Sequence, residues 1–239
     1  MSDDVELFSY VSQATAERPL AGMTVLVVED SRFACEAMRL LCLRSGARIR
    51  RADSLRSARR HLALYRPSAV VIDLGLPDGS GLGLIGDLAR AHPKVDVILA
   101  ISGDDDLRQA ALDAGADGFL TKPLTSLDAF QQAILSQLPK NPMPRGPRAL
   151  GGETVRPDHA AFRDDLAHVA DLLTGMNDEA RLGYITQFLE GLAVQAGDVP
   201  LQHAADRLRR SRNEGQPYGP DLARLAGLVQ DRLIGRQAV

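Results

Sequence analysis

Five polar side chains whose types suit phosphoryl chemistry stand at the ends of four apolar runs: Glu29, Asp30, Asp73, Ser102 and Lys122. The carboxyl ends of parallel strands meet at one edge of a sheet, so we expect these groups to converge. Three carboxylates in one crevice repel one another unless a cation lies among them, and their hard oxygen atoms suit Mg2+. Asp73 would then be the nucleophile that attacks phosphorus, while Lys122 and Ser102 hold phosphoryl oxygens.

The elements that must position these groups alternate between strand and helix from Met23 onward. Strands are expected at MTVLVVED, ARIRRA, Ala69–Asp73, VDVILAIS and DGFLTKP. Helices are expected at FACEAMRLLCLRSG, Ser54–Leu64, Gly81–Ala91, Asp104–Ala114 and from Ser126 to Leu138. This alternation predicts an α/β fold, with a five-stranded parallel, doubly wound sheet covered by helices on both faces.

In combination, these residues resemble the receiver domain of two-component response regulators, which has a flavodoxin-like fold, over roughly residues 23–138. The resemblance implies that Asp30, Asp73 and the backbone carbonyl of Gly75 ligate Mg2+ directly, and that Glu29 acts through water. It also implies that Asp73 accepts a phosphoryl group from a histidine kinase or a phosphotransfer protein. Such a domain is a phosphorylatable signalling switch and not an enzyme with a separate substrate.

The same resemblance implies a conformational switch. Ser102 would move to the phosphate and Phe119 would move inward behind it, although the family more usually has Tyr at that position. Lys122-Pro123 resembles the family's cis peptide. Gly75 and Asp104 occupy positions that tune dephosphorylation in this family.

The rest of the chain divides into an N-terminal extension, 1–22, a linker, 139–157, and a helical domain, 158–239. Val5, Phe8 and Val11 fit either a short amphipathic helix or a frayed terminus. The linker is rich in Pro and Gly, and its composition allows either tight docking or independent tumbling of the two domains. Beyond it, four apolar stripes at helical spacing predict a small all-α helical bundle.

Three functions for the helical domain remain open. The first is a module that binds a protein partner or dimerises when the receiver is phosphorylated. The second is a bundle like a histidine phosphotransfer domain, although His203 is followed by Asp206 and Arg207 where that family has Lys and Gly, and His159 and His168 fit no better. The third is DNA binding through an arginine cluster: Arg207, Arg209, Arg210 and Arg212. Interleaved acids make DNA the weakest of the three.

Composition sets broad limits on these functions. The net charge is -3, hydrophobic residues make up 45% and charged residues 25%, as in an ordinary globular protein. We expect neither a membrane span nor a signal peptide, and therefore a cytoplasmic chain. Cys35 and Cys42 are expected to be buried thiols. The basic run from Arg48 to Arg60 fits a solvated face better than a binding surface for a kinase or nucleic acid.

Overall fold

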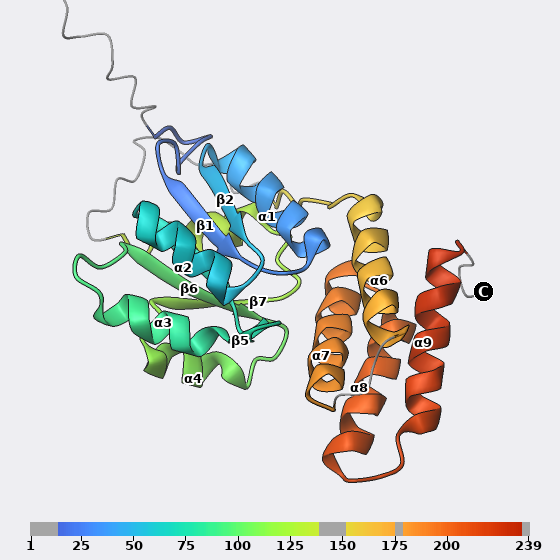
Figure 1. The fold of residues 1–239 in the computed structure, drawn as a ribbon. Helices are drawn as coiled ribbons and strands as arrows, with labels where there is room; N and C mark the ends of the chain where they lie inside the picture. Colours follow the sequence, from blue (N-terminus) through green and yellow to red (C-terminus); the bar gives the residue numbers. More distant parts are fainter. Residues whose placement is uncertain (1–13, 139–151, 175–178, 236–239) are drawn as a thin grey trace, which may run out of the picture.

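The computed structural model describes residues 14–138, 152–174 and 179–235. They form an α/β unit followed by a bundle of helices that lies against it (Figure 1). The predicted fold class is therefore confirmed for both halves. The amphipathic helix considered around Val5, Phe8 and Val11 falls outside the described residues.

A five-stranded parallel sheet organises the α/β unit. Its strands are β1 (Thr24–Val28), β2 (Arg48–Ala52), β3 (Ala69–Asp73), β6 (Val97–Ser102) and β7 (Gly118–Thr121). They lie in the order β2-β1-β3-β6-β7, so the winding direction reverses between β1 and β3. The apolar runs of β1, β3 and β6 are buried because helices cover both faces of the sheet. The polar residues that follow these strands consequently meet at one edge.

Five helices cover the two faces of the sheet. α1 (Arg32–Ser45) and α5 (Leu127–Leu135) pack on one face. α2 (Leu55–Leu64), α3 (Gly81–Arg90) and α4 (Leu107–Ala114) pack on the other. The helix predicted from Asp104 starts instead at Leu107, because the Asp104 side chain accepts a hydrogen bond from the Asp106 amide and forms a local turn.

Several local features support or extend the sequence interpretation. A two-stranded hairpin, β4 (Gly75–Leu76) with β5 (Gly79–Ser80), fills the predicted turn after Asp73. The Lys122–Pro123 peptide is cis, as the resemblance implied. Cys35 and Cys42 are buried and form no disulfide. The six arginines of the basic run are all exposed: Arg48, Arg50, Arg51, Arg56, Arg59 and Arg60.

The packed α/β unit extends beyond the predicted limits of 23 and 138. Leu20, placed in the extension, is fully buried in the α/β core. Val155, placed in the linker, is also buried there, and its neighbour Thr154 forms a β-bridge with Ser126. A single apolar residue outside a helix or strand shows no repeating pattern. The burial of Leu20 and Val155 could therefore not be predicted from the spacing of apolar residues.

The helical domain consists of α6 (His159–Thr174), α7 (Glu179–Ala196), α8 (Val199–Asn213) and α9 (Gly219–Leu233). The predicted apolar stripes form its core, which also takes in Phe33 from α1. α6 and α7 contact α1, and α7 also contacts β4, so the bundle lies against the α/β unit on the side of α1 (Figure 1). No helix of the described ranges is long and apolar enough to cross a membrane.

Candidate functional site

Three carboxylates gather where β1 and β3 end. The two strands pair with Val28 beside Ile72, so Glu29 and Asp30 follow β1 next to Asp73. One oxygen from each of these carboxylates lies within 4.8 Å of the others. Glu29 and Asp73 are buried, and Asp30 is partly buried. Charges of one sign this close, away from water, require compensation by a cation.

Lys122 supplies part of that compensation. Its Nζ lies 2.7 Å from Oε2 of Glu29 and 3.1 Å from Oδ2 of Asp73. Burial alone would lower the pKa of Lys122, but the Asp73 and Glu29 carboxylates raise it above its ordinary value, so the ammonium stays charged. One ammonium against three carboxylates still leaves a negative site.

The pKa values of two carboxyl groups are raised, because these groups are buried and Lys122 compensates their negative charge only in part. Burial raises the pKa of Glu29 to about 8, and Lys122 offsets only part of the effect. Burial raises the pKa of Asp30 to about 6, against a hydrogen bond from Tyr184 that lowers it. Oε2 of Glu29 is buried, and the Lys122 ammonium is its close partner among the described residues. These donors therefore fit a divalent cation with its own water ligands.

Ser102 is placed beside this site and Phe119 is not. Ser102 ends β6, is buried, and lines one cavity together with Asp73 and Lys122. Its Oγ accepts a hydrogen bond from the Asp104 amide at 3.0 Å. Phe119 on β7 packs on the α3 and α4 side of the sheet, with the Arg108 guanidinium 4.5 Å above its ring. It does not line the cavity, so its predicted movement remains a prediction.

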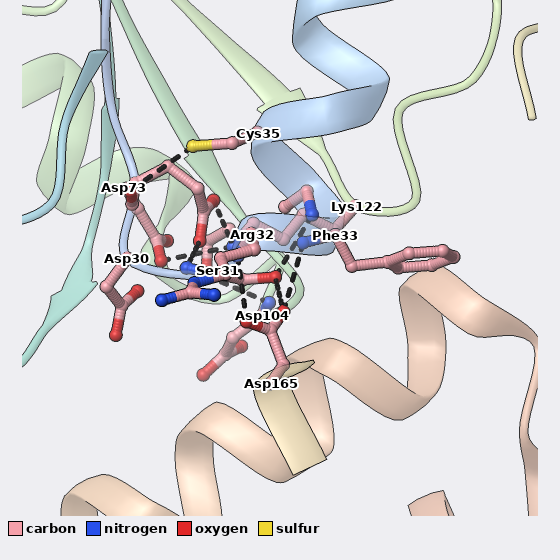
Figure 2. Close-up of polar contacts among 12 residues, drawn as sticks. Asp30, Ser31, Arg32, Phe33, Cys35, Asp73, Asp104, Lys122 and Asp165 are labelled. Atoms are coloured by element: carbon pink, nitrogen blue, oxygen red, sulfur yellow. Dashed lines mark hydrogen bonds and ion pairs between the residues drawn. The ribbon is translucent and has the colours of Figure 1, made fainter. Parts of the chain in front are cut away.

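The helical bundle bonds directly to the loop that carries Glu29 and Asp30. The Asp165 carboxylate on α6 is 2% exposed. It accepts hydrogen bonds from Ser31 Oγ at 2.8 Å, from the Arg32 amide at 2.9 Å and from the Phe33 amide at 3.0 Å (Figure 2). The two amides belong to the first turn of α1, where backbone N–H groups lack partners within the helix. Asp165 therefore caps α1 from another domain.

Two aromatic contacts complete this interface. The Tyr184 hydroxyl on α7 donates a hydrogen bond to Oδ2 of Asp30. Phe33 and Phe162 meet edge to face, with ring centroids 5.6 Å apart. Asp165, Tyr184 and Phe162 were not identified as site residues from the sequence. The one available signal was Asp165, an acid three residues after Phe162 on the apolar face of its helix.

A cavity of about 570 Å³ separates the two domains above the carboxylates. The α/β unit contributes Asp73, Gly75, Ser102 and Lys122, among others. α7 and α8 contribute Gln187, Gln195, Arg209 and Arg212, among others. A cavity of this size has room for a phosphoryl group, a hydrated cation and several waters. The predicted site residues other than Phe119 are thus brought together, and helices α7 and α8 of the second domain line the opposite side of the cavity.

The histidines and arginines proposed for other functions lie in different surroundings. His159, His168 and His203 are exposed, and none lines the cavity that holds Asp73. Arg209 forms ion pairs with Glu190 and Asp206, and Arg210 pairs with Asp206. Part of the arginine cluster is consequently balanced by acids within the bundle.

Comparison with known proteins identifies the family that the α/β unit matches. Residues 25–134 match the family described as the response regulator receiver domain. The KDP operon transcriptional regulatory protein KdpE of Escherichia coli is 35% identical over 99 residues, which cover 41% of this chain and 44% of KdpE. KdpE of Mycobacterium tuberculosis is 32% identical over 117 residues, covering 49% of this chain and 51% of that protein. A response regulator receiver domain structure from Methylobacillus flagellatus is 34% identical, with a TM-score of 0.42, covering 47% of this chain and 98% of that one.

The family match includes all five residues that the sequence analysis placed at strand ends. It ends before the helical bundle begins at His159. The chain spans about half the length of the curated relatives it matches.

Proposed function

We propose that this chain, whose residues 25–134 form a response regulator receiver domain, is a phosphorylation switch that controls the docking of its own helical bundle. Asp73 accepts a phosphoryl group from a histidine kinase or a phosphotransfer protein. One observation carries the proposal: residues 29–33 supply two site carboxylates and also the groups that bond to Asp165 and Tyr184. Chemistry at the site and docking of the bundle therefore act on the same short loop.

The proposed metal is Mg2+, held by Asp30, Asp73 and the backbone carbonyl of Gly75, with Glu29 acting through a water. When bound, it would neutralise charge on the phosphoryl oxygens during transfer. The buried, under-compensated carboxylates support this assignment. The assignment rests on the donor set of this chain.

The phosphoryl step itself uses three side chains of the receiver domain. An oxygen of the Asp73 carboxylate attacks phosphorus, and the bond from phosphorus to the donor breaks with its electron pair. Lys122, already 3.1 Å from Asp73, offers an ammonium to the phosphoryl oxygens. Ser102 offers its hydroxyl from the next strand, and Phe119 follows it as the second switch residue.

Phosphorylation would alter the charges that the bundle faces. It adds a dianionic group to the cavity beneath α7 and changes the environment of the Asp30 carboxylate that Tyr184 contacts. We expect this to loosen the interface and free the bundle to bind a protein partner or a second copy of the chain.

Free thiols at Cys35 and Cys42 support a reducing, cytoplasmic compartment.

Two other outputs are less well supported. The KdpE relatives are named transcriptional regulators, which raises DNA as a partner, but acids pair with Arg209 and Arg210 of the arginine cluster. A phosphorelay through His203 would require that residue to reach Asp73, and it is exposed and does not line the cavity. The first alternative predicts DNA binding and the second predicts phosphorylation of His203. The contacts of the bundle favour neither.

The experiment is phosphorylation by acetyl phosphate with Mg2+, followed by intact mass measurement. The native chain should gain one phosphoryl group, and Asp73→Asn should gain none. Asp53→Asn, in an exposed loop after β2, is the matched control and should behave like the native chain. Equal phosphate on native and Asp73→Asn chains would show that the acceptor is another residue.

A further inference from the structure

Gln187 on α7 reaches across the domain interface to Gly75. A Cβ atom built on Gly75 would lie 2.7 Å from Nε2 and 2.9 Å from Cδ of Gln187. The carboxamide of Gln187 therefore occupies the space that a side chain at position 75 would fill. Position 75 belongs to β4, two residues after Asp73.

The backbone of Gly75 does not itself demand glycine. Its φ lies outside the left-handed region, unlike that of Gly79 at 138°. Among the described residues, the Gln187 side chain is the nearest group that a larger residue would meet. The missing side chain and the inserted carboxamide are thus complementary features of two domains.

Gln187 lines the cavity that also contains Asp73, Ser102 and Lys122. Its carboxamide makes no hydrogen bond to any residue in the described part of the chain, so both its donor and its acceptor are available. Two other residues of α7 that line the cavity, Thr186 and Glu190, already have hydrogen-bond or ion-pair partners. The Thr186 hydroxyl donates to the Leu182 carbonyl, and Glu190 pairs with Arg209 and would repel a phosphoryl group.

We propose that Gln187 positions the water that hydrolyses the aspartyl phosphate on Asp73, so that the docked bundle shortens the lifetime of the signal that releases it. This inference rests on the proposed function, because it requires Asp73 to be phosphorylated. The carboxamide oxygen accepts a hydrogen bond from the attacking water, and the amide nitrogen donates to a phosphoryl oxygen.

The hydrolysis balances with water as its only co-reactant. The water oxygen forms a bond to phosphorus while the bond between phosphorus and the Asp73 oxygen breaks. The electron pair of the broken bond returns to Asp73 as carboxylate. Both protons of the water leave on the orthophosphate, or one of them passes to solvent. Gln187 takes no proton, so its contribution is orientation alone.

Orientation by Gln187 is available only while the bundle is docked. A phosphorylated chain whose bundle remains docked therefore returns quickly to the resting state. A chain whose released bundle has been captured by a partner loses Gln187 from the site and keeps its phosphoryl group longer. Capture of the bundle would prolong the signal.

The test measures decay of aspartyl phosphate after the donor is removed, in the full chain with Mg2+. Gln187→Leu keeps the side-chain size and removes both hydrogen-bonding groups, and it should slow the decay by about 10-fold. Gln202→Leu on α8, which lines the same cavity, is the matched control and should leave the decay unchanged. Before phosphorylation, hydrogen exchange at the Arg32 and Phe33 amides should be as slow in both variants as in the native chain, because neither substitution removes a hydrogen bond to Asp165.

A rescue variant separates orientation from packing. Gly75→Asn combined with Gln187→Ala places a carboxamide in the vacated space from the receiver side, and it should restore fast decay. Native decay in a phosphorylated Gln187→Leu chain, or no recovery in the rescue variant, would overturn the inference while leaving the switch itself intact. Absence of any phosphate on Asp73 in the native chain would overturn both.

Discussion

The Tyr184 hydroxyl of α7 donates a hydrogen bond of 2.5 Å to Oδ2 of Asp30, the residue that follows Glu29 at the end of β1. A group of the second domain is therefore bonded to a carboxylate of the receiver site. Burial and the nearby Asp30 charge raise the pKa of Tyr184, so its hydroxyl remains a donor. Docking of the bundle and occupation of the site consequently compete for one carboxylate.

The first prediction concerns Asp165. Asp165→Ala removes the acceptor of three hydrogen bonds, and it leaves the Arg32 and Phe33 amides and the Ser31 hydroxyl without that partner. We expect the unfolding free energy to fall by about 2 to 3 kcal/mol, with faster exchange at both amides. Denaturant titration and hydrogen exchange measure the two effects.

Asp164→Ala provides the control for Asp165. It breaks only the exposed ion pair with Arg32, so stability should change by less than about 1 kcal/mol. Equal effects of the two substitutions would show that Asp165 does not hold the domains together.

The second prediction concerns Tyr184. Tyr184→Phe keeps the ring beside Phe188 and removes the hydroxyl that bonds to Asp30. Because Oδ2 of Asp30 is then free, we expect Mg2+ affinity at pH 8 to rise about 3- to 10-fold, measured by calorimetric titration. Tyr65→Phe, whose hydroxyl contacts His61, should leave the affinity unchanged. Weaker Mg2+ binding by Tyr184→Phe would mean that the hydroxyl assists the metal site instead of competing with it.

The third prediction is a pH dependence of stability without metal. The pKa of Glu29 is raised from 4.5 to about 8 and that of Asp30 from 3.8 to about 6 by burial. A raised carboxyl pKa means that the folded state binds more protons, so its stabilisation is complete at low pH and is lost as pH rises through the folded pKa. Between pH 6 and 8 the unfolding free energy should fall by about 2 kcal/mol, chiefly through Glu29.

Saturating Mg2+ is the control for this pH dependence. The cation stabilises the ionised carboxylates, so the decline between pH 6 and 8 should shrink or reverse. Thermal or denaturant unfolding with EDTA and with Mg2+ gives both curves. Identical slopes in the two conditions would contradict a metal site at Glu29, Asp30 and Asp73.

The receiver half was predictable because its signals are local and periodic. β3 is an apolar run that ends in Asp73, and parallel pairing with β1 brings Glu29 and Asp30 beside it without any further information. The positions of single residues outside the periodic elements could not be predicted in this way. Leu20 and Val155 pack into the same core from outside the periodic elements, and Asp104 begins a turn that delays α4.

The position of the bundle was not predictable from its stripes. Phe162, Leu166 and Val169 show which face of α6 is buried, but a buried face does not identify what lies against it. Asp165 lies on that face and accepts hydrogen bonds from the Ser31 hydroxyl and from two amides of α1, more than a hundred residues earlier in the chain. Gln187 is likewise an ordinary helix residue until Gly75 is seen beside it.

The most direct test of the switch is hydrogen exchange at the Arg32 and Phe33 amides in the same samples whose phosphorylation is counted by mass. These amides donate to Asp165 only while the bundle is docked. With acetyl phosphate and Mg2+, exchange at both amides should accelerate in the native chain and remain slow in Asp73→Asn. Unchanged slow exchange in a chain that carries a full phosphoryl group on Asp73 would contradict the account.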